Sequence, residues 1–384
     1  MKAHKSCGMA CQFIAPDYPA MEKAVHGRAR RAGDEQFFGP LQAMYRAEMT
    51  APVSGAQWTG ITTSLAADLL GRRAVDAVLT MVPDPEDIWR PKPALITDPA
   101  DMAKARGMRM GYAPLLALLE TAAARGLSRL AVIGIPCQVY ALRRIEASLG
   151  LKRLYVIGTP CSDNTSTENF HDFLARLDDA PDTITYLEFR PDFRVELRYC
   201  DGRTRLIPFL NLPISDLPPD FFPLTCRTCV DYTNSLADIT VGYMGGEGAQ
   251  WVLVRNARGA EMLAALGDRI RLSAPGARGN RTNAVKGFIA NTERAAGGLP
   301  LRRMPDWLRP IVSWLMPLTG PKGLEFARAR LEMKAAETIL HLRRAAPAKM
   351  KNMVPEHVWQ LAGSYGLVPK GHELSSSCQK NSGG

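Results

Sequence analysis

The chain has 384 residues, 46% of them hydrophobic and 22% charged, which is enough for a large buried core and excludes a disordered polymer. Its net charge of +10 suits a solvated basic surface, an acidic protein partner or an anionic lipid, and no Walker, zinc-finger or RNA-binding signature favours nucleic acid. The lack of an apolar leader, and of any apolar run of about 18 residues, predicts a cytoplasmic protein without a transmembrane segment. In such a chain, eight cysteines indicate metal or redox chemistry rather than a disulfide framework.

The amino-terminal part begins with Cys7 and Cys11, which are spaced Cys-x-x-x-Cys and are either metal ligands or idle thiols near the chain end. Residues 25–34 (VHGRARRAGD) are basic and are predicted to form a surface loop. Residues 36–49 are predicted to form a helix.

Residues 54–63 (SGAQWTGITT) form a small, polar stretch that runs into a predicted helix at 64–70 and a predicted strand at 77–81. A turn of small residues that opens a helix presents free backbone N–H groups to an anion, such as a nucleotide phosphate or a flavin. The stretch is neither a Rossmann fingerprint nor a P-loop, so an ordinary helix start is the alternative.

The middle of the chain alternates strands and helices. Helices are predicted at 115–125 and 139–149, and strands at 130–133 and 154–157. Each of these strands is followed by a turn with a Pro-Cys pair, which supplies Cys137 after the first strand and Cys161 after the second. The alternation predicts an α/β layer with partly parallel strands, and in such sheets ligands gather at the carboxyl ends of the strands.

A Cys-x-x-Cys pair, Cys226 and Cys229, lies further along the chain. Zinc sites, iron–sulfur clusters and redox disulfides all use this spacing. With Cys137 and Cys161, the pair gives four cysteines from three loops, which would make a cage for a cluster. A structural zinc site remains the alternative, and the scattered histidines indicate no hydrolytic metal site.

The remaining segments complete the predicted fold. Residues 183–214 alternate and carry an Asp-Gly turn, which predicts a hairpin with Cys200 as an ordinary strand residue. Residues 276–286 form a basic loop that either clamps phosphate or carboxylate groups or is simply solvated. Residues 300–323, with two tryptophans among prolines and arginines, are either an interfacial or tetrapyrrole-facing flap or a packed appended segment, and residues 323–344 are predicted to form a long amphipathic helix. The fold class is therefore mixed α/β (α+β): a partly parallel sheet with flanking helices, a hairpin-containing second half and a helical C-terminal extension.

Seven stretches of the chain resemble a known family when they are taken together. They are ACQFIAPDYP (10–19), VHGR (25–28), SGAQWTGITTSL (54–65), GIPCQVYALR (134–143), IGTPCSDNT (157–165), CRTCVDYTNSLADITVGYMG (226–245) and GNRTNAVK (279–286). Over most of residues 7–290 the chain resembles the family formed by the β-subunits of coenzyme F420-linked hydrogenases and dehydrogenases. Within that family it is most similar to the branch of ferredoxin-dependent divinyl chlorophyllide a 8-vinyl reductase and 7-hydroxymethyl chlorophyll a reductase.

The resemblance implies an oxidoreductase that contains FAD and one or two 4Fe–4S clusters. It implies that electrons pass from reduced ferredoxin through the clusters and the flavin to a chlorin, in chlorophyll or bacteriochlorophyll biosynthesis. Reduction of the 8-vinyl group of divinyl (proto)chlorophyllide a to ethyl is the first expectation. Reduction of a 7-hydroxymethyl group, or a non-catalytic role as an electron-transfer subunit, is the alternative. Peripheral contact with photosynthetic membranes and an oligomeric state are left open.

The resemblance also assigns roles to residues. It implies flavin binding by Ser54, Gly55, Gln57, Trp58, Thr59, Gly60, Tyr112, Asn280 and Arg281. It implies that Cys137, Cys161, Cys226 and Cys229 ligate one cluster and that Cys7 and Cys11 are the tail of a second cluster motif. Relatives carry a further Cys-x-x-Cys-Gly element upstream, so we expect either missing residues or an incomplete second cluster. No catalytic residue is assigned, and Tyr112 and Asp231 are candidates for polar roles beside the cofactors.

The predicted domain division follows from these roles. It comprises an N-terminal cluster-binding segment (1–34), a family domain with the flavin-binding turn (35–150), a second family domain with the Cys-x-x-Cys site (151–300), and a helical extension with a disordered tail (301–384).

Overall fold

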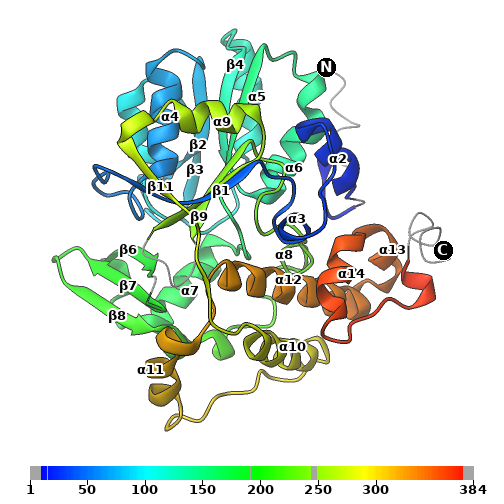
Figure 1. The fold of residues 1–384 in the computed structure, drawn as a ribbon. Helices are drawn as coiled ribbons and strands as arrows, with labels where there is room; N and C mark the ends of the chain where they lie inside the picture. The colour runs from blue at the N-terminus through cyan, green and yellow to red at the C-terminus, as the bar shows by residue number, and fades with distance from the viewer. Residues whose placement is uncertain (1–9, 15, 191, 244–248, 375–384) are drawn as a thin grey trace.

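The structure, a computed structural model, describes residues 10–14, 16–190, 192–243 and 249–374 (Figure 1). The strands are β1 (Ala43–Met49), β2 (Ala77–Pro83), β3 (Pro91–Ile96), β4 (Arg129–Gly134), β5 (Arg153–Gly158), β6 (Ile184–Phe189), β7 (Arg194–Tyr199), β8 (Thr204–Pro208), β9 (Ile239–Tyr243), β10 (Gln250–Val254), β11 (Ile270–Ser273), β12 (Ala277–Arg278) and β13 (Lys322–Gly323). The helices are α2 (Tyr18–His26), α3 (Asp34–Phe38), α4 (Ile61–Gly71), α5 (Leu118–Ala124), α6 (Pro136–Ile145), α7 (Thr167–Leu177), α8 (Leu224–Arg227), α9 (Ala257–Ala264), α10 (Thr282–Ala296), α11 (Arg309–Thr319), α12 (Leu324–Ala345), α13 (Met350–Met353) and α14 (Glu356–Gly363).

An eight-stranded sheet in the order β11-β1-β10-β9-β5-β4-β2-β3 forms the centre of the molecule. Strands β2, β4, β5 and β9 are parallel to their neighbours in this set. Strand β1 runs in the same direction, because β10 is antiparallel to both β9 and β1. The carboxyl ends of these five strands therefore lie at one edge of the sheet, which is where loops of an α/β protein hold ligands.

Helices cover both faces of this sheet. On one face, Leu65 and Leu69 of α4 and Met262 of α9 are buried against strand residues such as Ile157. On the other face, Val139 and Tyr140 of α6 pack with residues of α2, α5, β2, β4 and β5. Strands β4 and β5 are buried on both faces and read as continuous apolar runs, which is why sequence alone identified them.

Two smaller layers complete the fold. The antiparallel sheet β6-β7-β8 packs against α7 around Phe170, Leu174 and Leu197. Helix α12 contacts α8, α10 and α14, and its buried residues include Glu332 and Lys334 as well as apolar ones. The helix is thus enclosed on most sides rather than amphipathic at a surface, as Figure 1 shows from its central place beneath the sheet.

The mixed α/β fold with a partly parallel sheet and a helical C-terminal region is confirmed, with one local correction. The helix predicted for residues 36–49 is wrong, because α3 ends at Phe38 and β1 follows, paired with β10 and β11. The basic stretch 25–34 is a surface loop as predicted, and its Arg28 and Arg30 form ion pairs with Glu35 and Glu22. The eight-stranded sheet takes strands from both sides of residue 150, and the domain division stays a prediction. No helix in the described part of the chain is both long and apolar enough to span a membrane.

Candidate cofactor site

The Cys-x-x-Cys pair lies on a single tight turn. Helix α8 begins after Pro223, whose carbonyl accepts the N–H of Cys226 at 2.9 Å, and the N–H of Cys229 then donates to the carbonyl of Cys226 at 3.0 Å. The turn therefore presents both thiols from one piece of backbone. It packs against α12, which gives it a rigid support.

The two other predicted ligands follow the neighbouring strands β4 and β5. These strands pair in register, with Gly134 opposite Gly158, so Cys137 and Cys161 leave the sheet side by side. The N–H of Cys161 donates to the carbonyl of Tyr232 at 3.0 Å, which joins this loop to the segment that follows Cys229. The structure therefore brings the three cysteine-bearing loops together at the carboxyl edge predicted for them.

Asn234 fixes the arrangement of these loops. Its side-chain amide donates to the carbonyl of Gly134 at 2.7 Å and to that of Thr159 at 3.2 Å, so one side chain joins the ends of β4 and β5. A Cβ at Gly158 would lie 2.7 Å from Asn234, and glycine is needed there for this close approach. Asn234 itself has a φ of 58°, a left-handed conformation that asparagine tolerates better than most residues.

For Cys137, Cys161 and Cys229, another thiol of the set contributes to a raised pKa. Desolvation by the surrounding chain and the nearby Cys226 together raise the pKa of Cys137 to about 11, although its side chain keeps contact with solvent. Burial also raises the pKa of Cys161 well above its usual value, with contributions from Cys137, Cys229 and Cys226. Burial raises the pKa of Cys229 to about 12 and raises that of Cys226. Without a bound cation these cysteines are therefore protonated, and thiolates would need the positive charge of a metal centre.

Four thiols are a donor set that both a zinc ion and an iron–sulfur cluster accept. Within the described ranges, no group of three or more His, Cys, Asp or Glu side chains is placed so that it could hold a single metal ion. Cys137 is exposed, and Cys161, Cys226 and Cys229 are partly buried, so the set opens toward solvent on one side.

A buried lysine that sequence reasoning missed lies beside this set. The ammonium group of Lys334, on α12, donates to Asp163 at 2.7 Å and to Glu337 at 2.9 Å, and its charge lowers the pKa of Cys229 against the effect of burial. The side-chain amide of Gln12 donates to the Cys229 sulfur at 3.4 Å. A lysine in a helical pattern is ordinarily solvent-exposed, so no local signal marks Lys334.

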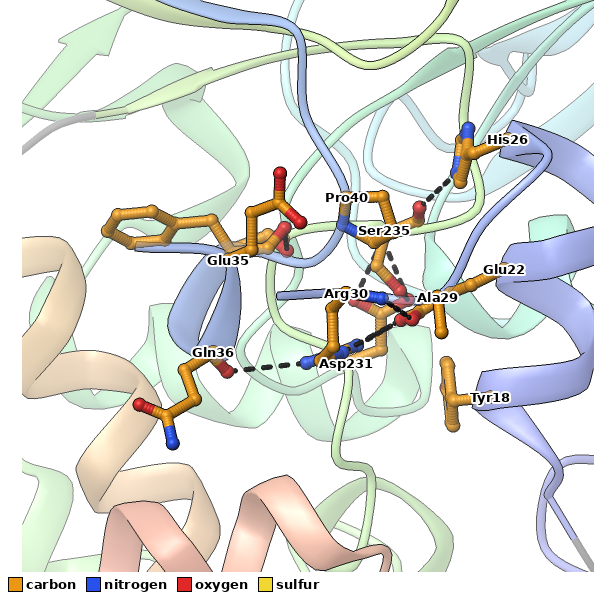
Figure 2. Close-up of polar contacts among 12 residues, drawn as sticks. Tyr18, Glu22, His26, Ala29, Arg30, Glu35, Gln36, Pro40, Asp231 and Ser235 are labelled. Atoms are coloured by element: carbon orange, nitrogen blue, oxygen red, sulfur yellow. Dashed lines mark hydrogen bonds and ion pairs between the residues drawn. The ribbon is translucent and has the colours of Figure 1, made fainter. Parts of the chain in front are cut away.

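The amino-terminal region supports the segment after the cysteine pair (Figure 2). Both carboxylate oxygens of Asp231 accept the N–H of Ser235 at 2.9 Å, and His26 contacts the carbonyl of Ser235 at 2.8 Å. Beside them, Arg30 forms an ion pair with the fully buried Glu22 at 2.5 Å. Asp231, a candidate for a polar role, is therefore fully engaged in shaping this loop, and burial raises its pKa.

The remaining cysteines differ in position. Cys11 is exposed, and its thiol is among the groups that raise the pKa of Cys137, so it approaches the four-cysteine set. Cys7 lies outside the described residues, so its predicted role in a second cluster is not examined by the structure. Cys200 is exposed next to the β7–β8 turn, as a strand-end residue.

The predicted flavin loop, residues 54–60, joins β1 to α4 at the same edge of the sheet. The hydroxyl of Thr59 donates to Gln250 at 3.1 Å, and the N–H of Trp58 donates to Glu188 at 2.9 Å. The Trp58 ring lies 5.3 Å from the ring of Tyr243, at the end of β9. Gly60 has a φ of 83°, and a Cβ there would meet Val53 at 2.7 Å, so the turn that opens α4 requires glycine.

Tyr112 lies beside Cys226, one of the predicted cluster ligands. Its hydroxyl donates to the carbonyl of Asn164 at 2.9 Å and is 4.0 Å from the Cys226 sulfur. The Asn164 side chain in turn bonds both backbone groups of Gly111, which attaches the Tyr112 loop to the loop after β5. Tyr112 is 56% exposed, so its ring is accessible to a bound molecule.

Asn280 and Arg281 are placed elsewhere. Arg281 pairs with Glu332 at 3.0 Å and with Glu325, both on α12, and its charge lies near the Phe37 ring. The side chain of Asn280 accepts the N–H of Thr282 at 2.8 Å. Figure 1 places α10, which these residues precede, on the opposite side of the molecule from the loop before α4. Flavin binding by these two residues stays a prediction, and their described contacts support α10 and α12 instead.

Comparison with known proteins identifies the family of this chain. Two family models match the chain, both described as "Coenzyme F420 hydrogenase/dehydrogenase, beta subunit": the model of its N-terminal part covers residues 44–120, and the model of its C-terminal part covers residues 127–277. The chain is thus an oxidoreductase-type protein with an electron-transfer fold. It belongs to the family of coenzyme F420 hydrogenase/dehydrogenase beta subunits.

Individual relatives agree with this assignment. An uncharacterised protein of Nostoc sp. is 37% identical over 361 residues, which is 93% of this chain and 89% of that protein. The chloroplastic 7-hydroxymethyl chlorophyll a reductase of Oryza sativa is 36% identical over 371 residues, or 93% of this chain and 79% of that protein. The F(420)H(2) dehydrogenase of Methanosarcina mazei has a subunit that is 27% identical over 224 residues, or 57% of this chain and 61% of that protein.

A solved structure shares the fold. A chain of the F420-reducing [NiFe] hydrogenase complex from Methanosarcina barkeri aligns with a TM-score of 0.56 and 20% identity. The alignment covers 70% of this chain and 97% of that chain. At this identity the match shows the architecture alone.

Proposed function

We propose that this protein is a ferredoxin-dependent reductase that uses a 4Fe–4S cluster and FAD to reduce a substituent of a chlorin-type tetrapyrrole. The observation that supports this most strongly is the meeting of Cys137, Cys161, Cys226 and Cys229 from three loops. They meet at the sheet edge that also carries the Ser54–Gly60 turn. Family membership supports the same cofactor pair.

The reduced substituent is proposed to be a hydroxymethyl group. The rice relative that carries the name 7-hydroxymethyl chlorophyll a reductase matches 93% of this chain, and this favours the alternative from the sequence over reduction of the 8-vinyl group. Vinyl reduction becomes the second candidate, because a vinyl group is also a substituent at the rim of a chlorin and needs the same two electrons.

When bound, a cluster would supply one-electron transfer and FAD would supply the change to two-electron chemistry. The chain contributes binding, orientation and charge. The four thiolates would hold the cluster, the Gln12 amide donates to the Cys229 sulfur, and the Lys334 ammonium adds positive charge to the site. Both contributions stabilise negative charge on the thiolate side of the centre.

The electron donor is proposed to be an acidic ferredoxin. A net charge of +10 attracts an acidic partner over a range set by the Debye length, so association should weaken as salt increases. The Cys137 side of the cysteine set is exposed, which offers a short electron path from a docked donor.

The test begins with anaerobic purification and determination of flavin, iron and acid-labile sulfide per chain. One cluster predicts about four irons with FAD. Cys226→Ser should lose most of its iron and sulfide, whereas Cys200→Ser, at an exposed cysteine outside the set, should keep them. Zinc in place of iron and flavin would refute the proposal.

Turnover then separates the candidates. The loaded protein is incubated with reduced ferredoxin and either 7-hydroxymethyl chlorophyll a or divinyl chlorophyllide a, and products are resolved by chromatography. Conversion of the hydroxymethyl pigment supports the first candidate, and conversion of the divinyl pigment alone supports the second. A loaded protein that converts neither pigment but passes electrons to a partner oxidoreductase would indicate a non-catalytic subunit.

A further inference from the structure

Helix α11 turns an apolar stripe toward solvent. Trp307, just before the helix, is 71% exposed, and Trp314 and Leu318 within it are 70% and 65% exposed. With Ile311 they recur at intervals of four, three and four residues, which places them on one face of a helix. An apolar face of this kind normally packs on a core, yet no residue of α11 is buried.

The stripe continues onto the neighbouring segment. Helix α11 contacts residues 209–211, and Phe209 and Ile214 in this region are also exposed. An ion pair between Arg303 and Asp216 fastens the chain before α11 to the same segment. Figure 1 shows α11 at the lower edge of the molecule beside β8. We call this surface the α11 patch: Phe209, Ile214, Trp307, Ile311, Trp314 and Leu318.

The segment that carries α11 has a net positive charge. Residues 276–323 contain eight arginines and lysines and two acidic residues, so this eighth of the chain carries +6 of the total net charge of +10. Arg294 and Arg302 are exposed in the segment that leads into α11. Tryptophan and leucine flanked by arginine is the composition of helices that lie in the interface of an anionic bilayer.

We propose that the α11 patch docks on the surface of an anionic lipid bilayer, with α11 lying in the plane of the interface. Eleven residues span about 16 Å at 1.5 Å per residue, well short of the ~30 Å hydrocarbon core, so the helix inserts from one side only. A second copy of the chain fits the surface less well, because two segments of the same positive charge would face each other. Docking of the α11 patch on a bilayer would set where the protein lies and does not depend on the proposed function.

The test is co-sedimentation of the full chain with vesicles. One set contains equal parts of phosphatidylglycerol and phosphatidylcholine, and the other contains phosphatidylcholine alone. Wild-type protein should bind the anionic vesicles, more weakly as salt rises, and its tryptophan emission should be quenched by brominated acyl chains. Trp307→Ser with Trp314→Ser should weaken binding by about tenfold or more, since both rings leave the interface.

A matched control is Ile88→Ser with Val368→Ser, which removes two exposed apolar side chains outside the patch and should leave vesicle binding unchanged. Urea midpoints of all variants check that each is folded. Absence of binding to anionic vesicles by wild type, or equal binding by the tryptophan variant, would overturn the proposal. A third outcome would also overturn it: wild-type protein that does not bind vesicles and is a dimer by light scattering, with a tryptophan variant that is a monomer.

Discussion

Asn234 joins the ends of β4 and β5, and substituting it should damage both the stability and the candidate site. Its amide makes two hydrogen bonds, at 2.7 and 3.2 Å, from a fully buried position with a φ of 58°. Asn234→Gly removes both bonds and leaves the backbone unstrained. At about 1 kcal/mol net for each bond, the free energy of unfolding should fall by about 2 kcal/mol.

Asn234→Ala removes the same bonds and adds the strain of a left-handed residue with a Cβ. That strain is about 1–2 kcal/mol, and it is partly offset because alanine has less freedom than glycine in the unfolded chain. The alanine variant should therefore be about 3 kcal/mol less stable than wild type, and about 1 kcal/mol less stable than the glycine variant.

The assay is anaerobic urea unfolding followed by fluorescence, with iron and sulfide measured on the same samples. Asn283→Ala, at an exposed position of α10, is the control and should change the free energy of unfolding by less than about 0.5 kcal/mol. Two Asn234 variants within about 0.5 kcal/mol of wild type would refute the argument about the joined strand ends. A glycine variant less stable than the alanine variant would refute the argument about φ.

Three further predictions concern the buried charges and close contacts around the site. Asp238→Asn should cost about 3–5 kcal/mol, because it removes the fully buried carboxylate that pairs with Arg143 at 2.8 Å and with Arg258 at 2.9 Å, and Arg143 keeps the ion pair with Glu146. Asp201→Asn, at an exposed pair, should cost under about 0.5 kcal/mol. Burial alone would raise the pKa of Asp238, but Arg143 and Arg258 hold it below its usual value of about 3.9. The stabilisation by the ionised Asp238 is therefore complete above about pH 4 and is lost as the pH falls through the folded-state pKa. In urea unfolding, the free energy difference between wild type and Asp238→Asn should shrink only in strong acid. Lys334→Gln removes the buried cation near Cys229 and should lower the reduction potential of the proposed cluster by ~60 mV, which is a tenfold change in the equilibrium constant for one-electron reduction. An EPR redox titration measures this potential, and the control Lys351→Gln, at an exposed lysine, should leave it unchanged. Gly158→Ala brings a methyl group to 2.7 Å from Asn234 and Ala237 and should lower the free energy of unfolding by about 1–3 kcal/mol, measured by thermal or urea unfolding. The control, Gly287→Ala in α10, has open space around it and should raise the free energy of unfolding by about 0.5–1 kcal/mol. Similar effects of the two substitutions would contradict the packing described at Gly158.

Local sequence pattern was sufficient for the parallel strands β4 and β5 and for the placing of Cys137 and Cys161 after them. Strands β4 and β5 are short apolar runs followed by helices, and parallel strands of this kind are buried on both faces whatever the rest of the chain does. Because their cysteines come directly after the strands, the edge at which they lie follows from the alternation itself. Cys226 and Cys229 do not follow a strand, so their place beside Cys137 and Cys161 was a hypothesis from the Cys-x-x-Cys spacing and the family resemblance. The ligand role of all four stays a prediction.

Only the tertiary structure shows which residues from distant parts of the chain pair with or pack against these elements. Strand β1 looked helical because its pairing partners, β10 and β11, come more than 200 residues later in the chain. Lys334 lies beside Cys229 because α12 packs under the cysteine turn, a contact between residues more than 100 positions apart. Likewise, a helix pattern specifies that α11 has an apolar face but not whether that face turns to the core or to solvent. Periodicity records the conformation of one segment, whereas burial and charge pairing depend on what the folded chain places opposite it.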